Sequence, residues 1–172
     1  MTREFASLAL NIISNERLTV VKFSNWLLFN VYMPCSGTVN RQLLYNDILQ
    51  EIQALISAYL TCNYVISGDF NVSLDCRSPL GDVVNCFLNN NNLSRCDVLF
   101  HVSTKFTYVS ESLNFASLIN YTVTSSTEST VAFNILDLDV NLSDHLPLMV
   151  VCLCKVPTTH IKTKCENSNC SF

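Results

Sequence analysis

The sequence predicts an α/β protein in which two β-sheets pack as a sandwich flanked by helices. Many short apolar runs with the character of strands are interrupted by few helical patterns, which is typical of a sheet-rich mixed fold. One helical pattern, at residues 41–60, lies between apolar runs at residues 26–32 and 64–67, the order expected of a crossover between two strands. With 172 residues, 49% of them apolar and 14% charged, the chain fits one globular domain with a sizeable core.

The first strands are predicted from short apolar runs and the turn residues between them. Residues 5–13 and 18–23 are expected to form a hairpin, joined by the polar residues 14–17. Residues 26–32 form a near-continuous apolar run, as expected of a strand buried on both faces. Pro34 ends this strand, because proline cannot donate a hydrogen bond to a sheet.

The helix predicted at residues 41–60 is the clearest element of the chain. Its apolar side chains recur at helical spacing, at Leu44, Ile48, Ile52, Leu55 and Tyr59. Thr38 or Asn40 is placed to cap its first turn.

The second half of the chain has weaker patterns. Ser-Pro-Leu-Gly at residues 78–81 predicts a turn, and residues 82–88 predict a short helix. Further strands are predicted at residues 106–109, 117–123, 131–138 and 148–153. The domain is therefore expected to span residues 1–156, and the polar residues 157–172 are predicted to be a tail or linker.

Composition excludes several classes of protein. Nine cysteines without a Cys-x-x-Cys pattern, in a chain without a signal peptide, favour reduced thiols in an intracellular protein, nuclear or cytoplasmic and not secreted. No apolar run reaches the roughly 18 residues of a membrane span. The net charge is −4 and no basic patch is present, so charge alone does not indicate a nucleic-acid binder.

The candidate functional stretch is Tyr-Val-Ile-Ser-Gly-Asp-Phe-Asn at residues 64–71. Its apolar beginning predicts a buried strand that stops at Gly68. Asp69 and Asn71 follow at alternate positions, which places both polar groups on one side of an extended segment. An acid and an amide at a strand end could hold and direct a water molecule. The alternative is an ordinary turn, because Gly, Asp and Asn are common turn residues.

Three other stretches add polar groups beside predicted strands. Ser-Asp-His-Leu-Pro at residues 143–147 places Asp144 and His145 just before the last strand, as an acid/base or phosphate-binding pair or as a plain polar loop. Ser-Leu-Ile-Asn-Tyr at residues 117–121 carries the amide of Asn120, and Asn-Val-Tyr-Met-Pro at residues 30–34 ends a strand with the phenol of Tyr32.

In this order the four stretches resemble the endonuclease/exonuclease/phosphatase superfamily, most closely the apurinic-type endonuclease domain of non-LTR retrotransposons. The resemblance covers roughly residues 6–153. It implies a four-layer α/β/β/α sandwich, hydrolysis of DNA phosphodiester bonds with Mg²⁺ or Mn²⁺, and DNA as the partner. A reverse transcriptase fused in the parent element is a further partner that it allows.

The resemblance also implies a role for each matching residue. Asp69 matches the acid that orients or deprotonates the attacking water, and Asn71 the amide that fixes this acid and the phosphate. His145 matches the group that contacts the scissile phosphate. Asp144, with Asp69, matches a ligand of the metal, and Tyr32 matches a phenol near the phosphate. The chemistry fits, because a hard cation, a donor and a base all lower the barrier to phosphodiester hydrolysis.

One residue of the matching stretches, Asn120, departs from the family pattern. Two others, Thr107 and Ser117, agree with it. The family carries an aspartate at the position of Asn120, where it holds and charges the histidine, whereas an amide offers a hydrogen bond without the charge. Thr107 and Ser117 lie in supporting motifs behind the matching residues.

The expected beginning of the family pattern is also absent. Family members begin with a strand bearing an Asn and a strand bearing a metal-binding Glu, and neither Glu4 nor Glu16 lies in a matching motif. The first strands are therefore expected to be missing and the metal to be held weakly.

Four functional hypotheses follow. The first is a metal-dependent phosphodiesterase or DNA endonuclease domain by descent, impaired by both departures. The second is a catalytically inactive retroelement remnant that binds DNA or a partner. The third is a phosphatase of the same superfamily acting on a lipid or inositol phosphate. The fourth is an unrelated secreted β-sandwich, which reduced thiols would count against.

Overall fold

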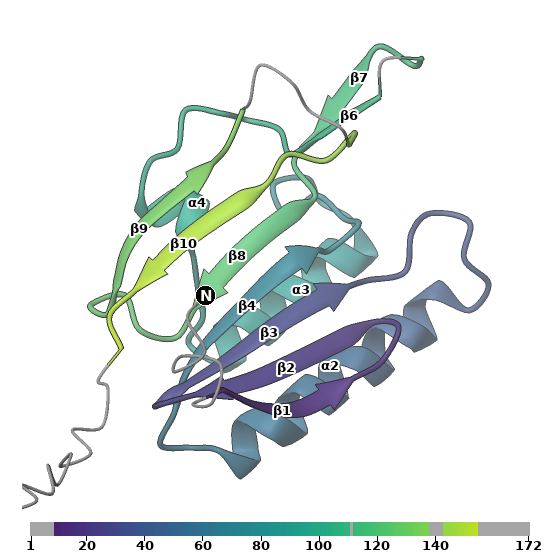
Figure 1. The fold of residues 1–172 in the computed structure, drawn as a ribbon. Helices are drawn as coiled ribbons and strands as arrows, with labels where there is room; N and C mark the ends of the chain where they lie inside the picture. Colours follow the sequence, from purple (N-terminus) through teal and green to yellow (C-terminus); the bar gives the residue numbers. More distant parts are fainter. Residues whose placement is uncertain (1–8, 111, 138–142, 155–172) are drawn as a thin grey trace, which may run out of the picture.

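The computed structural model describes residues 9–110, 112–137 and 143–154, in which a six-stranded sheet is the largest element (Figure 1). Its strands follow the spatial order β1-β2-β3-β4-β8-β5. They span Ala9–Ser14 (β1), Leu18–Phe23 (β2), Trp26–Tyr32 (β3), Asn63–Asp69 (β4), Asn120–Thr124 (β8) and Ser94–Arg95 (β5). Two smaller sheets pair β9 (Thr130–Ile135) with β10 (Leu148–Cys152), and β6 (Tyr108–Ser110) with β7 (Phe115–Ser117). The predicted fold class, a mixed α/β protein with several sheets and flanking helices, is confirmed.

The first part of the sheet follows the predicted order. β1 and β2 form the expected antiparallel hairpin, and residues 5–8 of the first predicted strand lie outside the described residues. β3 and β4 run parallel and are joined by helix α2 (Arg41–Ala58), as the crossover pattern predicts. Asn40 is the N-cap residue of α2, but its side chain makes no capping hydrogen bond. The helix therefore begins at the predicted residue, but the predicted side-chain cap is not formed.

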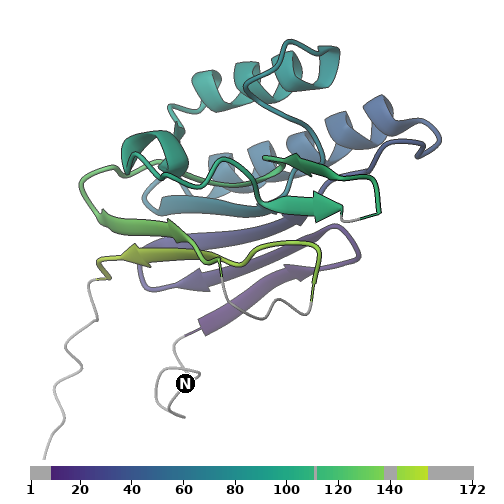
Figure 2. The ribbon, with the colours of Figure 1, turned by 90° about the horizontal axis from the view of Figure 1, so that it is seen from above.

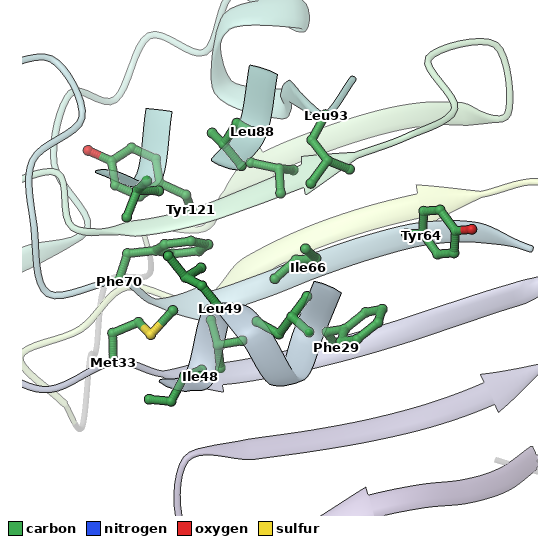
Figure 3. Packing of buried hydrophobic residues seen from close by; sticks show 14 of the residues in the cluster. Phe29, Met33, Ile48, Leu49, Tyr64, Ile66, Phe70, Leu88, Leu93 and Tyr121 are labelled. Atoms are coloured by element: carbon green, nitrogen blue, oxygen red, sulfur yellow. The ribbon is translucent and has the colours of Figure 1, made fainter. Parts of the chain in front are cut away.

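Helices α2 and α3 (Pro79–Asn90) cover one face of the large sheet (Figure 2). The side chains that alternate toward this face form the main core with the apolar sides of the helices. Figure 3 shows Ile66 of β4 near Leu49 of α2, and Tyr121 of β8 near Leu88 of α3, in one cluster that also holds Phe29 of β3. The core thus consists of every second side chain of the strands and of the side chains that recur about every 3.6 residues along one side of each helix.

The opposite face of the sheet is only partly covered. Leu28 and Tyr32 of β3 are 39% and 47% exposed, so the prediction that this strand is buried on both faces is wrong. Trp26 at the start of the same strand is fully buried, and its Nε1–H donates to the carbonyl oxygen of Leu153 at 3.0 Å. The β9–β10 pair, which lies on this side of the sheet in Figure 2, thus covers the beginning of β3 and leaves its end open.

Two predictions for the second half of the chain need correction. The turn predicted at residues 78–81 is instead the first turn of α3, in which Ser78 is the N-cap and accepts a hydrogen bond from the Gly81 N–H. Proline is well suited to the first helical position, because no intrahelical partner is needed there. The strand predicted at residues 117–123 is two strands, β7 and β8, which belong to different sheets and are separated by residues 118–119.

A second, smaller core joins α4 (Cys96–Leu99) to the β9–β10 pair. Cys96 and Val102 pack there with Phe133, Ile135 and Leu146. Neither α4 nor the short strand β5 was expected, because each is too short to show a period. The predicted tail at residues 157–172 lies outside the described residues. Within the described part of the chain, no helix is both long enough and apolar enough to cross a membrane.

Candidate functional site

Gly68 brings the carboxylate of Asp69 to the end of β4. The strand does not stop at Gly68, as the sequence suggests, but continues to Asp69. Gly68 has φ +144°, and a Cβ atom there would lie 2.1 Å from the carbonyl oxygen of Val31 on the neighbouring strand. Glycine is therefore required by the close approach of two backbones. In the sheet register, Asp69 lies beside Tyr32 of β3 on one side and Asn120 of β8 on the other.

Asn71 fixes the carboxylate of Asp69 through two hydrogen bonds. Its backbone N–H donates to Oδ1 of Asp69 at 2.8 Å, and its Nδ2 donates to Oδ2 at 2.9 Å. Nδ2 also donates to the carbonyl oxygen of Met33 at 2.9 Å. Asn71 adopts the left-handed conformation, with φ 51°, which asparagine tolerates better than most residues. The two polar residues thus form one hydrogen-bonded unit.

Burial raises the pKa of the Asp69 carboxyl above its ordinary value. The hydrogen bond from the Asn71 backbone, the nearby His145 and the Asn71 side chain each act to lower this pKa, whereas Asp144 acts to raise it. Both His145 and Asp144 therefore lie close enough to Asp69 to act on its charge. A carboxylate made more basic by burial and held in one orientation is suited to accept a proton.

His145 is linked to the sheet through Asn120. Its Nδ1 lies 2.9 Å from Oδ1 of Asn120, and its Nε2 lies 4.0 Å from Oδ1 of Asp144. Its ring packs against Tyr108 with a centroid distance of 5.0 Å. The side chain of His145 is 31% exposed and that of Asp144 is 59% exposed, so both are accessible from solvent.

Thr107 lies behind this pair, fully buried. Its Oγ1 accepts hydrogen bonds from the backbone N–H groups of Ile119 and Asn120, at 3.1 and 2.9 Å. Its hydroxyl lies 3.4 Å from Oδ1 of Asn120. Ser117 takes part through its backbone, since its carbonyl oxygen accepts a hydrogen bond from the Thr107 N–H. Both supporting residues therefore lie behind the site, as the motifs suggest.

All of the predicted site residues meet at one end of the large sheet. The carboxyl ends of β3 and β4 and the beginning of β8 lie there, beside the β6–β7 hairpin (Figure 1). The residues brought together are Tyr32, Asp69, Asn71, Asn120, Asp144 and His145. The edge outside the carboxyl ends of parallel strands is a common place for ligands in α/β folds.

Three residues near the site were not predicted. The guanidinium of Arg17, in the β1–β2 turn, lies 4.9 Å from the centre of the Tyr32 ring and adds positive charge beside the phenol. Arg41, at the start of α2, donates to the carbonyl oxygens of Pro34 and Asn71 at 2.9 and 2.5 Å. Tyr108 supports the His145 ring. No linear motif marks these residues, because each acts from a different element.

The described cavities do not all coincide with this site. A cavity of about 450 Å³ adjoins it, lined by Asn71, Arg41 and Ser73 together with the beginning of α3. A cavity of about 640 Å³ lies at the opposite end of β3 and β4, between the β2–β3 turn and the end of α2. The site is therefore defined by its hydrogen-bonded polar groups and not by the volume of a pocket.

The residues present do not make a complete metal site. Within the described residues, no group of three or more His, Cys, Asp or Glu side chains is arranged to hold a metal ion. Asp144 is the one carboxylate whose charge acts on Asp69 among the described residues. Mg²⁺ requires near-octahedral oxygen coordination and keeps several waters when few carboxylates are offered.

Comparison with known proteins identifies the fold. No protein-family model and no curated protein matches the chain. Among solved structures, the 3′ phosphatase NExo from Neisseria, bound to a product DNA hairpin, matches 82% of this chain with a TM-score of 0.60 and 15% identity. An endonuclease/exonuclease/phosphatase family protein from Bacteroides thetaiotaomicron matches 77% of it, with a TM-score of 0.57 and 17% identity.

These likenesses establish that the chain has the fold of endonuclease/exonuclease/phosphatase proteins. The matches span 66% of the length of the Neisseria protein and 53% of the length of the Bacteroides protein.

Proposed function

We propose that this chain is a phosphodiesterase domain that acts on DNA and whose catalytic power is reduced by Asn120. The observation that carries the proposal is the array of Asp69, Asn71, Asn120 and His145, hydrogen-bonded in two linked pairs at one edge of the sheet. DNA is supported as the substrate by the motif order of the sequence and by a structural neighbour that was solved with a DNA hairpin product.

The array supplies the groups that phosphodiester hydrolysis needs. Asp69 accepts a proton from water as the water oxygen bonds to phosphorus and the bond to the leaving ester oxygen breaks. The leaving oxygen takes a proton from solvent. His145, protonated at Nε2, donates to a phosphoryl oxygen on which negative charge accumulates, and Arg17 beside Tyr32 adds positive charge at the edge of the site.

Asn120 weakens this arrangement because it is neutral. A carboxylate at that position would stabilise the imidazolium form of His145, whereas an amide oxygen only accepts its Nδ1–H. Hydrogen bonds to a charged partner contribute about 1.5–3 kcal/mol and neutral ones about 0.5–1.5 kcal/mol. The neutral amide therefore gives the imidazole that faces the phosphate less electrostatic support than a carboxylate would.

The proposal includes dependence on Mg²⁺ or Mn²⁺, which the sequence resemblance implies. Asp69 and Asp144 are the residues that would contact such an ion, and they offer fewer ligands than it needs. No step of the proposed reaction is assigned to the ion. The weakness of the donor set supports low activity in addition to the effect of Asn120.

Descent from a non-LTR retrotransposon endonuclease, with a reverse transcriptase as a former or present partner, is the origin we propose. The order of the four motifs supports it. All seven cysteines among the described residues are unpaired, which supports the expected intracellular location, nuclear or cytoplasmic.

Each of two alternative functions is supported by a specific observation. The neutral Asn120 and the incomplete set of carboxylates favour a catalytically inactive remnant that binds DNA. The likeness to a 3′ phosphatase favours hydrolysis of a terminal phosphate instead of an internal phosphodiester bond.

One assay distinguishes these functions. Supercoiled plasmid and a DNA duplex ending in a 3′ phosphate are incubated with the protein in Mg²⁺, in Mn²⁺ and in EDTA. We expect slow nicking of the plasmid with either metal, lost in EDTA and lost in Asp69→Asn and His145→Ala. Asn89→Ala, which changes an exposed asparagine of α3, is the matched surface control. Release of phosphate without nicking would favour the phosphatase, and equal nicking by Asp69→Asn would contradict the proposal.

A further inference from the structure

The hydrogen bonds of Thr107 determine which way the Asn120 amide faces. A hydroxyl group has two acceptor lone pairs and one donor proton. The N–H groups of Ile119 and Asn120 both donate to Oγ1 of Thr107, at 3.1 and 2.9 Å, and so occupy both lone pairs. The Thr107 hydroxyl is left with its proton, which it donates to the Asn120 side chain at 3.4 Å. The atom that faces Thr107 must therefore be the acceptor, Oδ1.

A reversed Asn120 amide would place Nδ2 against Thr107, where two donors would face one another. Nothing else in the described part of the chain opposes such a reversal, since Nδ2 has no hydrogen-bond partner there. Thr107 is thus the group that selects one of two amide orientations of nearly identical shape.

The amide orientation in turn selects the tautomer of His145. Oδ1 of Asn120 lies 2.9 Å from Nδ1 of His145 and can only accept, so Nδ1 must carry the proton. The Nε2 atom is then left with its lone pair toward the site, where it can bind a second proton. With the amide reversed, Nδ2 would donate to Nδ1, the proton would move to Nε2, and protonation of the ring would set two donors against each other.

We infer that Thr107 is a positioning residue that fixes the orientation of Asn120 and thereby holds His145 in the tautomer with its proton on Nδ1. The inference deepens the proposed function, on which its catalytic consequence rests. In a serine protease, an asparagine behind the catalytic histidine costs about 10⁴ in rate because the histidine adopts the wrong tautomer. Here Thr107 prevents that outcome, so Asn120 costs the site a charge but not the correct tautomer.

The tautomer is measured directly, without reference to activity. Two-bond ¹H–¹⁵N spectra of the full chain, recorded at about pH 8.5, above the ordinary titration range of histidine, show which ring nitrogen carries the proton. The three histidines are told apart with His101→Gln and His160→Gln. We expect a protonated Nδ1 and an unprotonated Nε2 for His145. A protonated Nε2 in the unchanged protein would overturn the inference.

The role of Thr107 is tested with a matched pair of variants. Thr107→Val keeps the shape and removes the hydroxyl, and we expect the signal of His145 to shift to the tautomer with the proton on Nε2. Thr107→Ser keeps the hydroxyl, and we expect the unchanged tautomer. Thr107→Val combined with Asn120→Asp should also keep the proton on Nδ1, because a carboxylate has no donor end. A His145 tautomer that is the same in Thr107→Val and Thr107→Ser would overturn the inference.

Failure to fold would not leave the question open, because the spectrum of the unchanged protein tests the tautomer by itself. Failure of the proposed function is also distinguishable. A tautomer that follows Thr107 in a protein that hydrolyses no DNA would support the positioning role and contradict the nuclease. In a protein that nicks DNA, we expect Thr107→Val to lower kcat at least tenfold and Thr107→Ser to retain most of it.

Discussion

At the scale of single residues, the candidate site depends on hydrogen bonds that hold a half-buried carboxylate in one orientation. Asp69 has a raised pKa because it is partly buried, and the two bonds from Asn71 keep that pKa from rising further. The balance between burial and hydrogen bonding sets how readily this carboxylate takes up a proton. This makes the charge of Asp69 sensitive to its neighbour.

Replacing Asn71 by glycine should raise the pKa of Asp69. The change removes the Nδ2–H bond to Oδ2, which favours the charged form, and keeps the left-handed backbone at φ 51° that glycine readily adopts. A ¹³C titration of the side-chain carboxyl of Asp69 measures the effect, and the ionised form should be lost at a higher pH than in the unchanged protein. Asn92→Gly, with φ 52° and away from the site, is the control. An unchanged or lowered pKa would show that the Asn71 side chain does not stabilise the carboxylate.

Replacing Gly68 by alanine should destabilise the protein by about 2 kcal/mol or more, because the new Cβ atom would overlap the backbone of Val31. Gly37→Ala is the matched control. Gly37 also has a positive φ, of +90°, but no atom lies within 4 Å of its Cβ position, so we expect about 1 kcal/mol from backbone strain alone. Urea denaturation measures both changes. Equal losses would mean that strain, and not the contact with β3, explains the glycine at position 68.

The sequence was sufficient to predict that these polar residues lie together but not how they face one another. Asp69, Asn71 and His145 stand beside apolar runs, where polar side chains are conspicuous. The contact between Thr107 and Asn120 joins residues that are distant in the sequence. The direction of its hydrogen bond depends on the two N–H groups that already occupy the lone pairs of the Thr107 hydroxyl. Arg17 likewise reaches Tyr32 of β3 from the turn that precedes the neighbouring strand β2. Such relations are properties of the folded chain and leave no pattern in the sequence.

At the scale of elements, the long periodic segments were predicted well and the short ones were not. Helix α2 and strands β2 and β3 lie where their apolar patterns indicate. The first turn of α3 was mistaken for a turn, because Ser78 and Pro79 are typical both of turns and of helix beginnings. The separation of β7 from β8 was missed, because the apolar residues 118–119 continue the pattern while the backbone changes sheets.

The cap of α3 should contribute measurably to stability. Ser78→Ala removes the acceptor of the Gly81 N–H and should lower the free energy of unfolding by about 1 kcal/mol. Asn40→Gly at the beginning of α2 should change it by less than about 0.5 kcal/mol, since Asn40 makes no capping bond and glycine accepts its positive φ. Thermal and urea denaturation of both variants test the contrast. A larger effect at Asn40 would contradict the assignment of the caps.

At the scale of the whole molecule, helices cover one face of the large sheet, and among the described residues the other face is open where the candidate site lies. Leu28 and Tyr32 remain exposed on the open side, while Trp26 is covered beside the end of β10. The apolar run at residues 26–32 could not reveal this difference, because a strand's own pattern does not record what packs against it. The open face leaves the candidate site accessible to a large ligand, as the proposed action on DNA requires.

The most direct test of the account is the effect of restoring a charge behind His145. Single-turnover cleavage of plasmid DNA in Mg²⁺ is compared for the unchanged chain, Asn120→Asp, Asp69→Asn and the double variant. We expect Asn120→Asp to cleave roughly tenfold faster, because a charged hydrogen bond to the imidazolium contributes about 1.4 kcal/mol more than a neutral one. Both proteins with Asp69→Asn should be inactive. A chain that cleaves as fast as Asn120→Asp, or that keeps its activity in Asp69→Asn, would contradict the proposed site.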